Sequence, residues 1–283
     1  MNENPIIVLL TDFGLTDAYV GTMKGVMLSI CPAAHLVDLT HAIEPQNIRQ
    51  AAYVLLTAFR YFPADTIFLI VVDPGVGTTR EPAAVETEHG FYVAPDNGVL
   101  SYVLRQVHVK QVVTLQNPAY RLPTLSQTFH GRDIFGPAAA HLAKGVPISE
   151  LGPAQLSLVT LNDPVMEVLP SSIRGEVLHI DHFGNIITSI GRLTWTTGDS
   201  LRLEPIFGLN RESLSAIPRL SCKITIGTYT LDKLNLTYGA VPPGDLTALV
   251  GSSGQLEIGV NQGHAARALS VSMGDPVQVL WGT

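Results

Sequence analysis

The chain has 283 residues, of which 46% are hydrophobic and only 14% charged, a composition typical of a folded globular protein rather than a disordered one. Its formal net charge is −7, and Lys and Arg form no cluster, which argues against binding to nucleic acid or to an anionic membrane. The apolar runs are too short to cross a bilayer. Residues 1–4 lack the positive charge of a secretory leader, and Cys31 and Cys222 have no metal-binding spacing. These features predict a cytoplasmic enzyme, and the sparse charge suggests an oligomer.

Residues 1–160 predict alternating strands and helices. The apolar segments that predict strands are 6–10, 35–39, 67–72, 83–86 and 91–94. The amphipathic segments that predict helices are 20–30, 48–59, 98–106 and 133 to just before 145. Thr16 or Asp17 is expected to cap the first helix, and Asp133 the last one. The pattern predicts an α/β domain with a central, mostly parallel sheet.

The pattern changes beyond residue 160. Residues 161–172 contain Pro164, Pro170 and two serines, which is typical of a linker. Short strands with turn residues about every 8–12 positions follow: 175–180, 186–190, 201–203, 223–226, 246–250 and 277–280. Residues 173–283 are therefore expected to form a small all-β domain, either a barrel or a sandwich.

Two aspartates follow predicted strands of the first domain. In an open α/β sheet, ligands bind beyond the carboxyl ends of the strands, and Asp12 and Asp73 occupy such positions. Asp12 could accept hydrogen bonds from both hydroxyls of a sugar diol. The alternative is a turn-forming aspartate that binds its own backbone.

The segment 73–80 reads Asp-Pro-Gly-Val-Gly-Thr-Thr-Arg. Its glycines allow a ligand to approach the backbone, but it has neither the ending of a Walker loop nor the glycine spacing of a dinucleotide-binding loop. Asp73 and Arg80 have opposite charges and can pair across the loop. Such a pair is either part of a site or a brace for the turn.

Two histidines are further candidates. His130 precedes the last predicted helix of the first domain, and Gly131 gives it freedom to point into a cleft. A lone histidine is more often structural. His182, in the turn 181–185, could join Asp12, Asp73 and His130 in a metal site, although no metal-binding spacing supports this arrangement.

Five short motifs occur in a characteristic order. They are Thr-Asp-Phe-Gly at 11–14, Val-Asp-Pro-Gly-Val-Gly at 72–77, Ala-Pro-Asp-Asn-Gly at 94–98, Phe-His-Gly-Arg-Asp at 129–133 and Asp-His-Phe-Gly-Asn at 181–185. Together they resemble the S-adenosyl-L-methionine (SAM) hydrolase (adenosine-forming) family, also called SAM hydroxide adenosyltransferases and related to fluorinases and chlorinases. The resemblance extends over about residues 6–281. It implies an α/β domain followed by a β-barrel, and a homotrimer whose active sites lie between subunits.

The resemblance also implies the reaction. SAM and water would give adenosine and L-methionine through attack of activated water or hydroxide at the ribose C5′. Asp73, Arg80 and His130 would form the catalytic triad, and no cofactor or metal would be needed. The halogenases carry other residues at these three positions and use a halide as nucleophile, so the residues present here argue against halogenation.

The same resemblance implies a set of substrate contacts. Asp12 would hold the ribose hydroxyls, while the methionine ammonium would lie at Asp181. Ser252 and Ser253 would lie near the methionine carboxylate, although these serines could also form a plain polar turn. The residues implied near adenine are Phe129, Asn185, Asn261 and Ala265. The chain departs from the family pattern at His264, where a smaller residue is expected.

Three other functions stay open at this point. A 5′-halogenase would use the same substrate with a halide. A sensor would bind SAM or adenosine without turnover. A metal-dependent hydrolase of a phosphoester or an amide would need a divalent ion.

Overall fold

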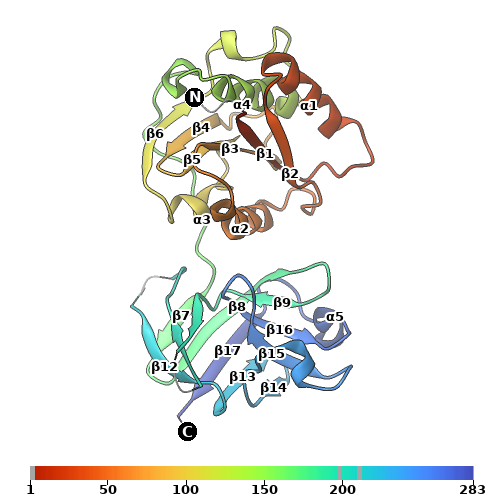
Figure 1. The fold of residues 1–283 in the computed structure, drawn as a ribbon, viewed down its shortest axis with the longest axis vertical. Coiled ribbons are helices and arrows are strands. Elements are labelled where there is room, and N and C mark those ends of the chain that lie inside the picture. Colours follow the sequence, from red (N-terminus) through yellow and green to blue (C-terminus); the bar gives the residue numbers. More distant parts are fainter. Residues whose placement is uncertain (1–3, 197–198, 209–211, 283) are drawn as a thin grey trace. The chain divides into compact units, whose positions relative to one another are not determined.

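The computed structural model describes residues 4–196, 199–208 and 212–282 (Figure 1). The chain divides into two compact units, Met1–Leu161 and Asn162–Thr283. Within the described residues, no helix has both the length and the apolar character that crossing a membrane requires.

Unit 1 (Met1–Leu161) is built around a six-stranded sheet in the order β2-β1-β3-β5-β4-β6. The strands are β1 (Ile6–Thr11), β2 (His35–Thr40), β3 (Thr66–Val71), β4 (Pro82–Thr87), β5 (Gly90–Pro95) and β6 (Val109–Thr114). β1 pairs in parallel with β2 and β3, and β3 does so with β5. β4 pairs antiparallel with β5 and β6. The sheet is therefore mostly parallel, with β4 running against the other strands.

Two hydrophobic clusters bury the faces of this sheet. Helices α1 (Tyr19–Ile30) and α4 (Gly136–Ala143) pack together on one face, where Ile7 and Leu9 of β1 point. Helices α2 (Ile48–Ala58) and α3 (Ser101–Leu104) cover the other face (Figure 1), where Val8 and Leu10 point. Because successive side chains of a strand face opposite sides, a strand covered on both faces needs an unbroken apolar run, and β1 has one.

The structure corrects three expectations about the helices of unit 1. Ala18 is the residue at the amino-terminal cap of α1, and no side chain caps this end, so the prediction of Thr16 or Asp17 is wrong. Asp133 is no cap either. It is fully buried in a π-helical turn, Gly131–Phe135, that precedes α4. The helix expected over 98–106 is a single turn, α3, and Gly98, with a positive φ of 94°, lies outside it.

β6 is not among the predicted strands. It reads Val-Lys-Gln-Val-Val-Thr and lies at the edge of the sheet, beside β4. An edge strand tolerates polar residues such as Lys110 and Gln111, since one side of it faces solvent. These two residues break the apolar run that would have marked it.

Unit 2 (Asn162–Thr283) contains two antiparallel sheets. The eight-stranded sheet has the order β14-β13-β17-β8-β9-β16-β15, with β7 paired to β8, and a three-stranded sheet has the order β10-β11-β12. The end strands β14 and β15 are in contact, so the larger sheet is nearly closed. Its strands are β7 (Met166–Leu169), β8 (Ser172–Ile180), β9 (Ile186–Thr188), β13 (Cys222–Ile226), β14 (Tyr229–Leu231), β15 (Leu246–Val250), β16 (Leu256–Val260) and β17 (Pro276–Trp281). The remaining elements are β10 (Leu193–Trp195), β11 (Ser200–Leu203), β12 (Leu214–Pro218) and the helix α5 (Ala265–Leu269).

β7 lies inside the segment that the sequence predicts to be a linker, 161–172. It pairs antiparallel with β8, with Met166 opposite Gly175 and Leu169 opposite Ser172. Met166 is buried, whereas Glu167 is exposed. The flanking prolines thus mark the ends of a short strand rather than an unstructured connection.

Candidate active site

A pocket of about 390 Å³ opens at the carboxyl ends of β1 and β3 in unit 1. This is the edge where a parallel sheet binds its ligands. The lining residues are Asp12, Phe13, Tyr19, Pro45, Gln46, Val71, Asp73, Pro74, Val76, Thr128, Phe129, His130 and Gly131. Asp12, Asp73, Phe129 and His130, which the sequence singled out, therefore lie around one cavity.

Asp73, Arg80 and His130 form a continuous chain of hydrogen bonds. Arg80 donates from Nε to Oδ1 of Asp73 over 2.8 Å and from Nη2 to Oδ2. The same Nη2 lies 2.9 Å from Nδ1 of His130. The side chains of Arg80 and Asp73 are only 9% and 5% exposed, so this ion pair is largely shielded from solvent. The guanidinium carbon of Arg80 lies over the ring of Phe135, 5.0 Å from the ring centroid.

The contact with Arg80 determines the protonation of His130. A guanidinium can only donate, so Nδ1 must accept and a neutral ring carries its proton on Nε2. Burial, followed by the positive charge of Arg80, lowers the pKa of His130 below its ordinary value of 6.5. At neutral pH, His130 is therefore a neutral imidazole with an N–H to donate.

Two glycines allow these segments to meet. Gly77 has a φ of 75°, and a Cβ at this position would clash with the carbonyl oxygen of Gln127. The 73–80 loop therefore lies directly against the segment that carries His130. Gly131 has a similar role, since its Cβ would lie 3.0 Å from Sδ of Met23 in α1.

Aromatic rings form the wall of the pocket. Phe13, Tyr19 and Phe129 contact one another in tilted or edge-to-face pairs, with ring centroids 5.2–5.9 Å apart. Phe129 was expected here, whereas Phe13 and Tyr19 were not. The sequence signal for Phe13 was its place in the Thr-Asp-Phe-Gly motif. Tyr19 belongs to none of the five motifs. It lies at the start of α1, so nothing in the sequence indicated that it lines a pocket.

Asp12 lies at the rim of the same pocket. Its Oδ2 accepts a hydrogen bond from the backbone N–H of Gln46 over 2.7 Å, while its Oδ1 has no partner within the described part of the chain. The partner of Asp12 lies 34 residues away in the sequence. The residue is therefore not the self-bonded turn aspartate that the sequence left as an alternative.

A second set of expected residues lies in unit 2. Asp181, Asn185 and Ser252 line a pocket there. Asp181 is bound within its own turn, where Oδ1 accepts from the backbone N–H of Phe183 and Asn185 over 2.9 and 2.8 Å and Oδ2 accepts from the Asn185 amide over 2.9 Å. Its carboxylate oxygens keep only their remaining lone pairs for a ligand.

The other residues expected in unit 2 do not line this pocket. Ser253 follows Ser252 but lies outside it, and Ala265 is fully buried at the start of α5. Asn261 donates its side-chain amide to the carbonyl oxygen of Val241 over 2.7 Å. His264 accepts the backbone N–H of Arg267 and so caps α5. His264 thus has a structural role at the start of α5.

Tyr238 and Glu257 line the same pocket and were not predicted. The Tyr238 hydroxyl donates to Oε1 of Glu257, and Glu257 is only 7% exposed. Burial raises the pKa of both groups. Glu257 alternates with apolar residues in β16. This pattern predicts the polar face of a strand and gives no indication of a pocket.

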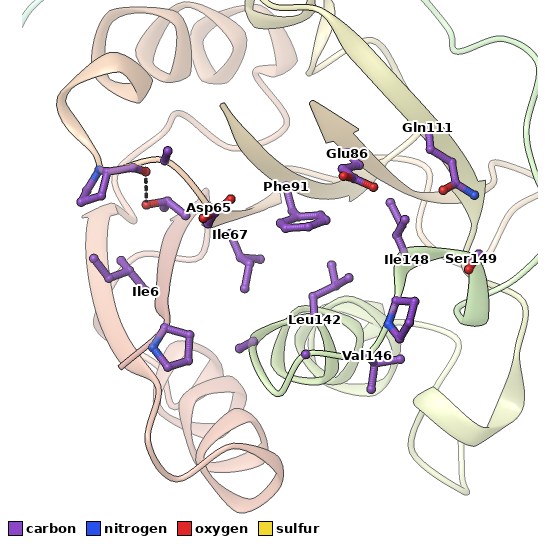
Figure 2. A pocket seen from close by; sticks show the side chains of 17 residues that line it. Ile6, Asp65, Ile67, Glu86, Phe91, Gln111, Leu142, Val146, Ile148 and Ser149 are labelled. Atoms are coloured by element: carbon purple, nitrogen blue, oxygen red, sulfur yellow. Dashed lines mark hydrogen bonds between the residues drawn. The ribbon is translucent and has the colours of Figure 1, made fainter. Parts of the chain in front are cut away.

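A cavity of about 400 Å³ also opens at the amino ends of β1, β3 and β5, the edge opposite to Asp73. Figure 2 shows Ile67, Phe91 and Leu142 pointing into it, with Glu86 and Gln111 at one side. Its walls are mainly apolar. Its charged lining residues are Asp65 and Glu86, and no histidine, lysine or arginine is among the described residues that line it.

Two family models match the chain. The SAM hydroxide adenosyltransferase N-terminal domain matches residues 7–152, and the corresponding C-terminal domain matches residues 175–278. The protein named (R)-S-adenosyl-L-methionine hydrolase from Salinispora tropica is 37% identical over 286 residues, which cover 100% of both chains.

Two further similarities extend this finding. A fluorinase from an Actinoplanes species is 32% identical over 222 residues, which cover 68% of this chain and 73% of the fluorinase. A crystal structure described as an uncharacterized conserved protein from Thermotoga maritima matches with a TM-score of 0.83 and 36% identity, covering 97% of this chain and 99% of that one.

Proposed function

Since the chain belongs to the SAM hydroxide adenosyltransferase family, we propose that Asp73, Arg80 and His130 activate the water molecule that attacks its substrate. The protein is an enzyme that hydrolyses SAM to adenosine and L-methionine. The C5′–sulfur bond breaks with its electron pair going to sulfur, a C5′–oxygen bond forms, and one proton is released. Because the leaving group is a neutral thioether, it needs no protonation.

What the enzyme must supply is an oxygen nucleophile in line with the C5′–sulfur bond. Holding the reactants at near-attack distance can lower a barrier by about 7–11 kcal/mol. The pocket beside Asp73 combines an aromatic wall with charged groups at its end. Such a site can hold a nucleoside against the rings and direct its C5′ towards the polar end.

The hydrogen bonds suggest a separate task for each catalytic residue. Asp73 offers the remaining lone pairs of its carboxylate to orient a water molecule and accept its hydrogen bond. His130 offers Nε2–H to the same water, because Arg80 occupies Nδ1. Arg80 supplies the positive charge that favours developing hydroxide character. The observation that carries this proposal is the continuous Asp73–Arg80–His130 contact beside the pocket.

The remaining substrate contacts are proposals that rest on the resemblance. Asp12 would bind the ribose hydroxyls, and its unoccupied Oδ1 supports this role. Asp181 would bind the methionine ammonium and Ser252 and Ser253 the carboxylate. The residues proposed near adenine are Phe129, Asn185, Asn261 and Ala265. Of these four, Asn185 lines the unit 2 pocket, whereas Asn261 and Ala265 do not.

The assembly and location are also proposals. We propose a homotrimer with active sites between subunits, and exposed apolar side chains such as Leu156 and Phe183 agree with buried subunit contacts. The second domain would be a β-barrel, as the nearly closed sheet suggests. Domain boundaries at 160 and 173 and a cytoplasmic location remain predictions from the sequence.

The test is hydrolysis of SAM in ¹⁸O-labelled water, with chloride present and absent. We expect adenosine that carries the label at its 5′-oxygen, at a rate independent of chloride. Unlabelled adenosine would contradict attack by water at C5′. A chloride-dependent 5′-chloro product would indicate the halogenase alternative, and intact SAM despite measured binding would indicate a sensor.

A further inference from the structure

The end of β5 and the loop that follows it carry a motif with no role in the site described so far. Residues 94–98 read Ala-Pro-Asp-Asn-Gly, and none of them lines the pocket beside Asp73. β5 is the neighbour of β3 in the sheet and runs parallel to it. The loop after β5 therefore emerges at the same edge as the loop that begins with Asp73.

Asn97 in this loop binds the residue directly before Asp73. Its Nδ2 donates to the carbonyl oxygen of Val72 over 2.9 Å. Its Oδ1 accepts the backbone N–H of Val99 over 3.2 Å, which fixes the orientation of the amide. The amide thus fastens the end of β3 to the loop after β5.

The neighbouring residue binds the other end of the 73–80 loop. The backbone N–H of Asp96 donates to the carbonyl oxygen of Glu81 over 2.9 Å, and Glu81 directly follows Arg80. Two adjacent residues of one loop therefore hold the residue before Asp73 and the residue after Arg80.

The loop between these anchors is closed by the Asp73–Arg80 ion pair and by a hydrogen bond from the Thr78 hydroxyl to the Gly75 carbonyl oxygen. Its backbone bonds are those from Val76 to Asp73 and from Thr78 to Gly75, at 3.2 and 3.1 Å. Two glycines lie within it. Because these bonds close the loop on itself, the anchors at its two ends hold the Asp73–Arg80 pair as a unit relative to the rest of the sheet edge.

We propose that Asn97 is a positioning residue for hydrolysis, acting through the Val72 carbonyl to keep Asp73 and Arg80 in register with His130. This inference rests on the proposed function of that triad. Asn97 lies outside the lining of the pocket beside Asp73, so its loss should affect the geometry of the catalytic groups and leave the aromatic wall and Asp12 in place.

The chain provides a matched control in Asn117. Its Nδ2 donates to the carbonyl oxygen of Glu150 over 2.7 Å, and its Oδ1 accepts the N–H of the residue two positions later, Ala119, over 3.0 Å. The bonding pattern is that of Asn97, but its partners lie outside the 73–80 loop and the pocket. Each alanine variant thus removes one bond donated by the amide and one bond accepted by it. Asn97→Ala does so beside the 73–80 loop and Asn117→Ala away from it.

The experiment measures kcat, the Kd for SAM and thermal unfolding for the full-length wild type and both variants. We expect a similar loss of thermal stability in the two variants. Asn97→Ala should lower kcat about 10–100-fold, since a displacement of about 1 Å can cost about 10²-fold, with the Kd changed less than about threefold. Asn117→Ala should keep kcat within about twofold of the wild type.

A second variant keeps the proposal testable if Asn97→Ala does not fold. Asn97→Asp has the same size and keeps the acceptor for Val99, but at neutral pH it replaces the donor to Val72 by an oxygen. It should lower kcat as Asn97→Ala does. A kcat equal to that of Asn117→Ala in either Asn97 variant would overturn the inference, whereas a wild type that binds SAM without turnover would overturn the proposed function itself.

Discussion

Asp73 in unit 1 and Asp181 in unit 2 both follow a strand, but they are held in opposite ways. Both oxygens of Asp73 contact a cation, Arg80, which in turn contacts a histidine from a distant segment. The oxygens of Asp181 accept from neutral N–H groups of its own turn, all within four residues. The first arrangement concentrates charge beside a pocket, and the second satisfies a carboxylate locally.

This difference separates a carboxylate that is placed for catalysis, Asp73, from one that mainly shapes its own turn, Asp181. A charge pair shielded from water is costly to assemble, and the histidine that contacts this pair comes from a segment 50 residues away, which only the tertiary structure brings close. A carboxylate held by its own turn costs little and mainly orients the backbone. We therefore expect substitutions at Asp73 to affect turnover and substitutions at Asp181 to affect binding and local stability.

The largest expected effect follows removal of the Asp73 charge. Asp73→Asn should lower kcat by about 10²–10⁴-fold, the usual contribution of a group that handles the proton of a nucleophile. Binding of SAM should stay nearly unchanged, as isothermal titration calorimetry can measure. An unchanged kcat would refute the catalytic role of the triad.

Removing Arg80, the positive partner of the ion pair, should lower the free energy of unfolding. Arg80→Met would leave the Asp73 carboxylate, 5% exposed, without its cation, which costs about 3–5 kcal/mol in the free energy of unfolding. Denaturant titration measures this loss. The double variant Arg80→Met/Asp73→Asn should recover part of it, and a loss that stays the same would mean that the unpaired charge is not its cause.

The rate should decrease in acid as His130 becomes protonated, because a proton on Nδ1 removes the acceptor for Arg80 and breaks the Asp73–Arg80–His130 chain of hydrogen bonds. Its pKa is lowered by burial and by Arg80, raised by Asp73 and Asp133, and lowered again by Arg121, with a net shift below 6.5. The acid limb of kcat/KM should therefore lie below pH 6.5 and approach a tenfold loss per pH unit. The unfolded chain binds this proton first, so stability also decreases as the pH falls below about 6.5.

A second half-buried histidine serves as the control for this pH profile. His141 in α4 also has a pKa lowered by burial, but it packs against Tyr120, away from the pocket. His141→Asn should keep the acid limb of kcat/KM unchanged. Loss of the acid limb in this variant would show that His141, and not His130, is the group that titrates.

The smallest effect is expected at Asp181. Asp181→Asn keeps one acceptor for the backbone N–H groups but presents an amide to the amide of Asn185, so about 0.5–1.5 kcal/mol of stability should be lost. KM for SAM should rise while kcat stays within about tenfold of the wild type. A decrease in kcat as large as that of Asp73→Asn would erase the distinction between the two carboxylates.

The sequence determined those features that depend on neighbouring residues. The unbroken apolar runs predicted β1 and β3 because strands covered on both faces need them. The opposite charges of Asp73 and Arg80, seven residues apart in a glycine-containing loop, predicted their pairing. The five ordered motifs identified the family, which the family models and a full-length relative confirm.

Only the tertiary structure decided the features that depend on distant segments. Asp133 looked like a helix cap, but packing buries it, and its carboxylate binds the Ser126 N–H and Arg132 instead. Tyr19 joins Phe13 and Phe129 because α1 packs beside the π-helical turn. Asn97 reaches the Val72 carbonyl because β5 lies next to β3. Local patterns specify strands, turns and charge pairs. Contacts between residues 25 or 50 positions apart form only when the folded sheet brings the loops at the ends of its strands together.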